Sequence, residues 1–77
     1  MGELPQISGR QLIKILELFG YRVVRQKGSH IRLAHSTEKA RKPLTVPDHK
    51  VVGKGLLHKI LRDAELDTGI FIKTLKG

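Results

Sequence analysis

Four histidines are the residues of this sequence best suited to proton transfer near neutral pH, and they stand at positions 30, 35, 49 and 58. An imidazole gains and loses its proton in the physiological range, so a positioned histidine can act as a general base or acid. The chain has no cysteine, which excludes disulfides, thiolate metal sites and cysteine nucleophiles. The histidines and carboxylates lack the spacing of zinc or two-metal sites, and no glycine-rich nucleotide loop is present, so neither a metal nor a cofactor is expected.

His30 is the best placed of the four histidines. It follows a Gly-Ser turn and begins an expected strand, on the side away from Ile31 and Leu33. Lys27 and Arg32 are close in the sequence, and their positive charge favours the neutral imidazole that can accept a proton. The residues alone leave open whether His30 is functional or simply an exposed side chain.

The other three histidines have less specific expectations. His35 ends the same strand beside a polar loop and is expected to be solvated. His58 is expected on the exposed side of a helix, where a phosphate contact and simple exposure both remain open. His49 lies in a connector, where it is either structural or lines a site near the edge of a sheet.

The composition is strongly basic, with 15 Lys and Arg against 7 Asp and Glu and a net charge of +8. Such an excess on a small surface attracts polyanions, of which nucleic acid is the commonest. Solubility alone would also account for it. A membrane is disfavoured as the partner, because no basic helix carries a Trp/Phe-rich face and no apolar run approaches the roughly 20 residues of a membrane span.

Basic residues near His30 are candidates for contacts with RNA. Arg25, Lys27 and Arg32 are expected to stabilise negative charge on a phosphoryl group. Lys50 and Lys54, near the start of the expected second helix, are candidates for holding the phosphate backbone. A solvated basic face is an equal alternative for these two lysines.

Helix and strand signals show which elements must position these residues. Ser8 and Gln11 form a Ser-x-x-Gln capping box before an apolar stripe, which predicts a helix over residues 9–19. A second helix is expected after a connector over residues 48–53, and Asp67 is expected to cap a short helical tail that Gly69 would weaken. β-branched and alternating segments predict three strands, over residues 21–27, 30–35 and 43–47.

This order of elements predicts an α+β fold, α-β-β-β-α with a short C-terminal helical tail. Its three-stranded antiparallel sheet should carry the helices on one face and leave the other face open. The length leaves room for one domain, over residues 1–77. The first residues lack a basic region followed by an apolar one, so no secretory signal is expected, and the cysteine-free chain fits a cytoplasmic protein.

Around the Gly-Ser-His element the chain resembles the HicA toxin family, also called YcfA-like proteins. The resemblance extends from Ile7 to about Leu75. Its features appear in order as Ser8-Gly9, Gly20-Tyr21, Arg25-Gln26-Lys27-Gly28-Ser29-His30, Thr45-Val46-Pro47 with His49, and Gly55-Leu56-Leu57 leading to Ile60-Leu61.

The resemblance implies a fold similar to double-stranded-RNA-binding domains and the activity of a type II toxin. Members are mRNA interferases, endoribonucleases that cut messenger RNA with the histidine of the Gly-Ser-His element and are neutralised by a HicB antitoxin. Carried onto this sequence, the catalytic residue is His30, and Gly28 and Ser29 shape the turn that presents it.

A metal-independent mechanism follows as a hypothesis. Neutral His30 would take the proton of a ribose 2′-OH, which would attack the adjacent phosphorus and leave a 2′,3′-cyclic phosphate, so DNA would be spared. Charge and fold alone equally permit a non-catalytic double-stranded-RNA-binding module. They also permit an interaction protein whose basic surface matches an acidic partner.

Overall fold

A computed structural model describes residues 4–77 of the chain. The expectation of no secretory signal rests partly on residues 1–3, which lie outside the described residues. The elements are α1 (Gly9–Leu18), β1 (Tyr21–Lys27), β2 (His30–His35), β3 (Leu44–Pro47), α2 (Lys54–Asp63) and α3 (Thr68–Lys76). The predicted order is confirmed, and the first helix and third strand are each one residue shorter than predicted.

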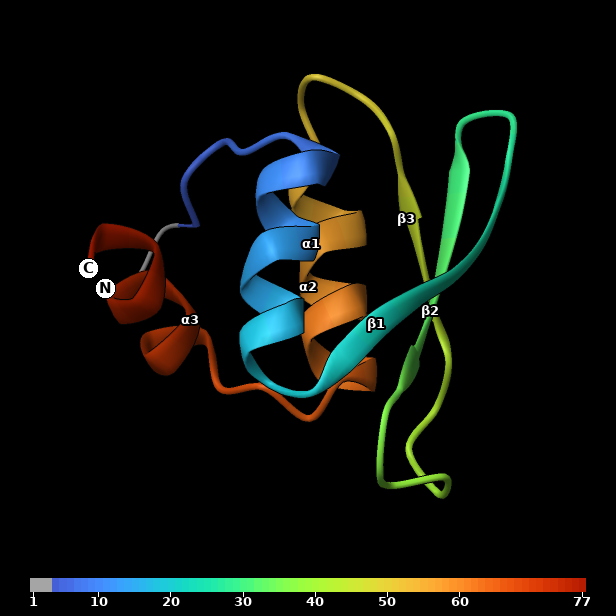
Figure 1. The fold of residues 1–77 in the computed structure, drawn as a ribbon. Helices are drawn as coiled ribbons and strands as arrows, with labels where there is room; N and C mark the ends of the chain where they lie inside the picture. The colour runs from blue at the N-terminus through green and yellow to red at the C-terminus, as the bar shows by residue number, and fades with distance from the viewer. Residues whose placement is uncertain (1–3) are drawn as a thin grey trace.

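The three strands form one antiparallel sheet in the order β1-β2-β3. Helices α1 and α2 cover one face of this sheet, and α3 lies beyond them on the side away from the strands (Figure 1). Among the described elements, none covers the opposite face. The predicted α+β architecture with helices on one sheet face is therefore confirmed.

The hydrophobic core fills the space between the sheet and the helices. Each fully buried aliphatic or aromatic side chain stabilises the fold by about 1.5–3 kcal/mol relative to exposure. Phe71 of α3 is completely buried, so the helical tail is anchored in the same core, and Gly69 does not interrupt α3. The largest fully buried side chains are Phe71, Leu12, Leu16, Leu33, Leu57, Leu61 and Val46.

The first turn of α1 packs closely against the segment that follows β3. Ser8 caps the helix by accepting from the Gln11 N–H, and the Gln11 side chain accepts from the Ser8 N–H, so the predicted capping box is confirmed. The Gly9 N–H donates to the His49 carbonyl oxygen at 2.9 Å. A Cβ on Gly9 would collide with the Pro47 carbonyl oxygen, so this approach requires glycine.

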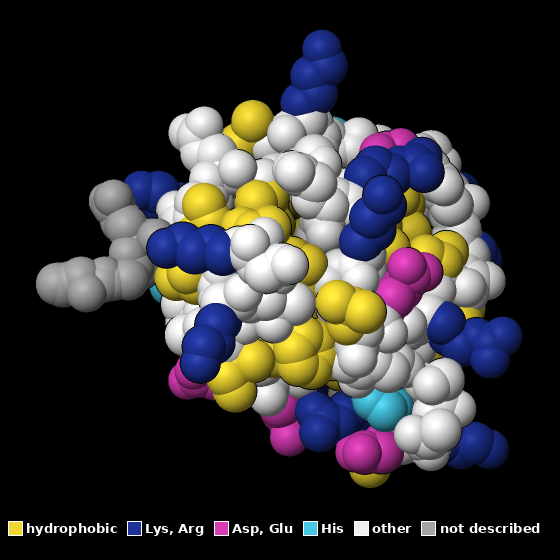
Figure 2. Space-filling model, turned by 60° about the vertical axis from the view of Figure 1, so that its left-hand side comes forward, with side chains coloured by type: hydrophobic (Ala, Val, Ile, Leu, Met, Phe, Trp, Pro, Cys, Tyr) yellow, Lys and Arg dark blue, Asp and Glu magenta, His cyan; other side chains and the backbone are white. Residues whose placement is uncertain are grey.

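The surface is mixed on the side that carries α3. Figure 2 shows hydrophobic side chains in several patches there, with lysine and arginine side chains projecting around the outline. Large apolar side chains exposed on the helices include Leu18 and Ile70. Within residues 4–77, the helices are too short or too polar to cross a membrane.

Candidate active site

A two-residue turn joins β1 to β2 and presents His30 at the start of the second strand. Lys27 and His30 are the last register pair, so Gly28 and Ser29 form the loop. Gly28 has φ +59° and lies in the left-handed region that favours glycine, whereas Ser29 has no positive φ. A positive φ at the first loop position is the pattern of a type II′ hairpin turn, whose twist matches that of the strands.

The side chain of His30 lies on the open face of the sheet. Along β2, His30 and Arg32 are exposed, whereas Ile31 and Leu33 are buried against the helices. This alternation confirms the prediction that the histidine and the arginine share the face away from the core.

An irregularity in β1 brings Arg25 and Lys27 to that same face. Val23 pairs with Leu33, but the next register pair is Arg25 with Arg32, so Val24 has no partner and forms a β-bulge. Strict alternation would have placed Arg25 on the same side as Val23. Because directly paired residues share a face, the bulge instead sets Arg25 beside Arg32, and two residues further along Lys27 lies beside His30 on the same face.

These side chains enclose a small basic hollow on the open face, which we call the cation hollow. It has a volume of about 270 Å³ and is lined by Arg25, Lys27, His30, Arg32 and Thr45. The described residues that line it include no acidic side chain. Arginine and lysine side chains held in this way suit an anionic group such as a phosphate. The structure thus brings His30 together with the three basic side chains that the sequence predicted around it, Arg25, Lys27 and Arg32.

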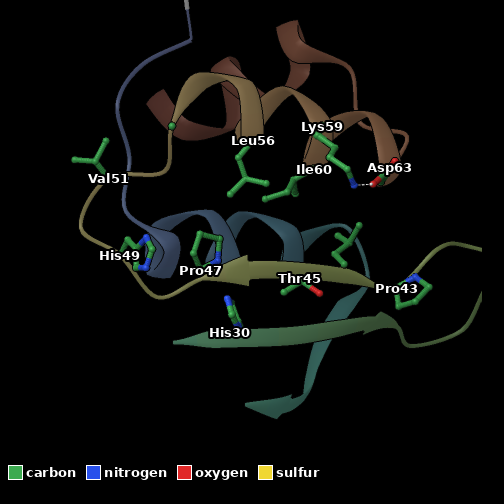
Figure 3. Close-up of a pocket in the computed structure, with 12 residues that line it drawn as sticks. His30, Pro43, Thr45, Pro47, His49, Val51, Leu56, Lys59, Ile60 and Asp63 are labelled. Atoms are coloured by element: carbon green, nitrogen blue, oxygen red, sulfur yellow. Dashed lines mark hydrogen bonds and ion pairs between the residues drawn. The ribbon is translucent and has the colours of Figure 1, made fainter. Parts of the chain in front are cut away.

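His30 also lines a second hollow, of about 450 Å³, between β3 and α2, which we call the edge hollow. Leu56 and Ile60 point from α2 toward β3, and His30 points toward the same strand from β2 (Figure 3). His49 lines one end of the edge hollow. This placement supports the alternative that His49 lines a site near the edge of the sheet. His30 and Thr45 line both hollows.

The carboxylate that lines the edge hollow is engaged by lysines. Lys59 Nζ donates to Asp63 Oδ2 at 3.0 Å (Figure 3), and Lys42 Nζ lies 3.8 Å from Asp63 Oδ1. The hydrogen bond from Lys59 lowers the pKa of Asp63. Within the described residues, no three His, Asp or Glu side chains come together in a group that could hold a metal ion.

Two residues that sequence patterns did not indicate hold the turn before His30. The Asp48 N–H donates to the Ser29 carbonyl oxygen at 2.7 Å, which joins the end of β3 to the turn. Arg10 binds both carboxylate oxygens of Asp48, with Nε to Oδ1 and Nη2 to Oδ2 each 2.9 Å. Hydrogen bonding from Arg10 lowers the pKa of Asp48. Arg10 and Asp48 are 38 positions apart, and no local pattern connects them.

Three other nominated residues lie elsewhere on the surface. Lys50 is exposed in the connector before α2, and Lys54 is exposed in the first turn of α2, both outside the two hollows. His58 is exposed on α2 and also lies outside the hollows. The structure therefore groups Arg25, Lys27 and Arg32 with His30, but not Lys50 or Lys54.

The expectation that His35 is merely solvated is wrong. Its ring is half-buried, with Nε2 3.1 Å from the Phe19 carbonyl oxygen and Nδ1 accepting from the Glu38 N–H at 3.0 Å. The ring also packs edge-on against Tyr21, with centroids 5.0 Å apart. A Cβ on Gly20 would collide with this ring, so Gly20 leaves room for it. His35 therefore ties the end of α1 to the loop after β2.

Comparison with known proteins identifies the family. The sequence profile of the HicA toxin of bacterial toxin–antitoxin systems matches residues 9–66. The matched range begins at α1 and includes the Gly28-Ser29 turn, His30, β3 and all of α2. Neither the curated proteins nor the solved structures contained a match. Because the matched range covers well over half of the 77 residues, the chain belongs to the HicA toxin family of bacterial toxin–antitoxin systems.

Proposed function

We propose that this protein is an mRNA interferase, a metal-independent endoribonuclease that is the toxin of a type II pair. The observation that carries the proposal is the position of His30, whose exposed imidazole shares the cation hollow with Arg25, Lys27 and Arg32. A base beside preformed cations is what cleavage of a ribose-phosphate bond requires. We further propose that residues 1–77 form a single domain that acts on messenger RNA in the cytoplasm.

The reaction begins with proton transfer to His30. The neutral imidazole takes the proton of a ribose 2′-OH, and the 2′-oxygen attacks the adjacent phosphorus while the bond to the 5′-oxygen of the next nucleotide breaks. Arg25, Lys27 and Arg32 stabilise the charge on the phosphoryl oxygens. The products end in a 2′,3′-cyclic phosphate and a 5′-OH. DNA, which has no 2′-OH, is not cleaved.

The leaving 5′-oxygen must itself gain a proton, and we propose His49 as the donor. Its exposed side chain lines the edge hollow together with His30. A protonated His49 gives its proton to the leaving oxygen as the bond breaks, and His30 keeps the proton from the 2′-OH. Solvent then returns both imidazoles to their starting states.

Besides RNA, the proposed partner of this protein is a HicB-type antitoxin. A chain with net charge +8 suits an acidic protein partner, because complementary charge accelerates association and disfavours wrong partners. An antitoxin that covers the open face of the sheet would keep RNA away from His30 and the cations around it. Lys50 and Lys54 remain candidates for additional backbone contacts with RNA.

Digestion of RNA in the presence of EDTA tests the catalytic proposal. The wild type is expected to leave 2′,3′-cyclic phosphate ends on RNA and to leave single-stranded DNA intact. His30→Ala should lower the rate by about 100-fold or more, the usual worth of a general base. His58→Ala is the matched control, because His58 is an exposed histidine outside both hollows. Inducible expression should arrest growth with the wild type and the control, but not with His30→Ala.

Two outcomes would contradict this proposal. Cyclic-phosphate ends that persist at the wild-type rate after His30→Ala would remove His30 from the reaction. RNA that is bound by the wild type but never cleaved would leave the alternative, a non-catalytic RNA-binding module.

A further inference from the structure

The edge hollow is continuous with the proposed site of cleavage. His30 and Thr45 line both hollows, so a phosphate held by the cations would lie beside the opening between β3 and α2. The volume of about 450 Å³ is within the range of about 300–1,000 Å³ that is usual for small-ligand sites. A ligand in the edge hollow would therefore lie next to a phosphate bound in the cation hollow.

The walls of the edge hollow suit a flat, partly apolar group. Leu56 is 39 % exposed and Val51 51 % exposed, although both are large aliphatic side chains beside the hollow. Pro47 and Ile60 are buried and contribute further apolar surface. Thr45 adds a hydroxyl that can form hydrogen bonds. Apolar surfaces with a polar group at the margin match the face and the edge of a nucleobase.

A peptide strand is a poor match for the same hollow. The Asp48 N–H bonds to Ser29, and the alternation of an antiparallel ladder then directs the backbone of Thr45 toward the free edge of β3. Pro43 and Pro47 stand on either side of Thr45 in that alternation and have no N–H to donate. Prolines at a sheet edge are a known obstacle to strand addition. The apolar walls are therefore a better candidate for ligand binding than the strand edge.

We propose that the edge hollow binds the unstacked base of a nucleotide next to the cleaved phosphate, and that the substrate is therefore single-stranded RNA. The inference rests on the proposed function and extends it to the substrate class. With the phosphate in the cation hollow, a neighbouring base needs only to turn away from its stack to enter between β3 and α2. A base in a duplex would first have to break its pairing, which costs free energy, whereas an unpaired base is free to enter.

Removal of the base and truncation of Leu56 form a cycle that tests this proposal. The cleavage position in a short RNA is mapped first. Two further RNAs are then synthesised, each with an abasic ribonucleotide on one side of that position. With the wild type, one of the two abasic substrates should lower kcat/KM by about tenfold, a typical worth of one bound base. With Leu56→Ala, the intact RNA should lose a similar factor and base removal should cost little more. Ile70→Ala, an exposed aliphatic truncation on α3, is the matched control and should retain the full effect of base removal.

Binding measurements separate this proposal from the proposed nuclease activity. The same RNAs with a 2′-deoxy sugar at the cleavage position cannot undergo the 2′-OH reaction, so their Kd reports binding without cleavage, and the difference between intact and abasic strands reports the contribution of the base. The wild type should bind these single strands more tightly than the matching duplex, and base removal should weaken binding with the wild type and Ile70→Ala but not with Leu56→Ala. This result would support the base site even if the wild type cleaved nothing.

Two results would overturn the base site. If base removal weakens binding by the same factor with the wild type and with Leu56→Ala, the edge hollow does not hold the base. If neither change affects RNA while Leu56→Ala abolishes neutralisation by the antitoxin, the edge hollow is a protein-docking surface instead. Circular dichroism melting of each variant checks that the truncations leave the fold intact.

Discussion

Arg10 holds Asp48 by two hydrogen bonds of 2.9 Å, one to each carboxylate oxygen. The backbone of Asp48 in turn donates to Ser29, the residue before His30. The first turn of α1 is thereby connected to the turn that presents the imidazole. An exposed ion pair contributes little by itself, but a bidentate arginine–carboxylate pair fixes direction as well as distance. We therefore regard Arg10 and Asp48 as positioning residues for His30.

Acid should weaken this connection, and Asp48→Asn should remove its pH dependence. Arg10 lowers the pKa of Asp48 below the ordinary 3.8, so the stabilisation is present above that value and is lost as the pH falls through the lower folded pKa. We expect Asp48→Asn to lower Tm at neutral pH and to show a smaller drop in Tm between about pH 5 and about pH 2.5 than the wild type. Thermal melting followed by circular dichroism measures both. Glu17 is a carboxylate with no ion pair within residues 4–77, so Glu17→Gln is the control and should melt like the wild type. If Tm of Asp48→Asn fell with pH as much as Tm of the wild type, the linkage would be contradicted.

His35 should matter for stability rather than for cleavage. His35→Ala removes the contact with the Phe19 carbonyl, leaves the Glu38 N–H without its acceptor and removes the packing on Tyr21. Losses of this kind cost about 2 kcal/mol in the free energy of unfolding. Urea denaturation measures the change. His30 is exposed at the other end of β2, so His30→Ala should leave the free energy of unfolding nearly unchanged. Equal losses of stability in both variants would argue against the assigned roles.

Gly28 and Gly55 should respond in opposite directions to the same substitution. Gly28→Ala introduces no clash, but φ +59° disfavours any residue with a Cβ, so a loss of about 1–2 kcal/mol is expected. Gly55→Ala lies within α2, where the added Cβ meets nothing within 4 Å, and should stabilise by up to about 1 kcal/mol. Denaturant midpoints compare the two. Gly28→Ala should also slow RNA cleavage because it disturbs the turn before His30; equal midpoints for both variants would contradict the strained turn.

The cation hollow should dominate the salt dependence of RNA binding. Arg25→Gln and Arg32→Gln each remove one charge from that hollow, and each should lower the slope of log Kd against log salt by about one unit or slightly less. Lys73→Gln removes an exposed charge from α3, on the side of the molecule away from the sheet, and should change the slope less. Fluorescence anisotropy at several salt concentrations measures the slopes. A uniform response of all three variants would show that net charge, rather than the hollow, governs binding.

Replacement of His49 should be rescued by a good leaving group. His49→Gln is expected to slow the cleavage of ordinary RNA by about 100-fold, because the 5′-oxygen then leaves without a proton. A substrate with a 3′-(4-nitrophenyl phosphate) needs no acid, so on it His49→Gln should approach the wild-type rate. His30→Ala should be slow on both substrates. Equal losses on both substrates for His49→Gln would mean that His49 binds RNA or supports the fold instead of supplying the proton.

Local features of the fold could be predicted because they depend on neighbours in the sequence. The capping box at Ser8 and Gln11, the glycine turn at Gly28 and the alternation from His30 to Leu33 each involve contacts within a few residues. Their outcomes follow from backbone sterics and burial of one face. The environment of His35 could not be predicted, because its partners, Phe19 and Glu38, belong to segments whose approach no local pattern specifies.

The sequence by itself determined which elements form, and it nominated His30 and the cations around it. Tertiary structure decided which of those cations meet the imidazole. The bulge at Val24 depends on the pairing of β1 with β2, and it turns Arg25 and Lys27 from the core side to the open face. The edge hollow and the Arg10–Asp48 pair likewise arise where α2 and α1 pack beside β3, between residues far apart in the chain. Such contacts depend on how the whole core packs, and the hydrophobic periodicity of the sequence does not predict them.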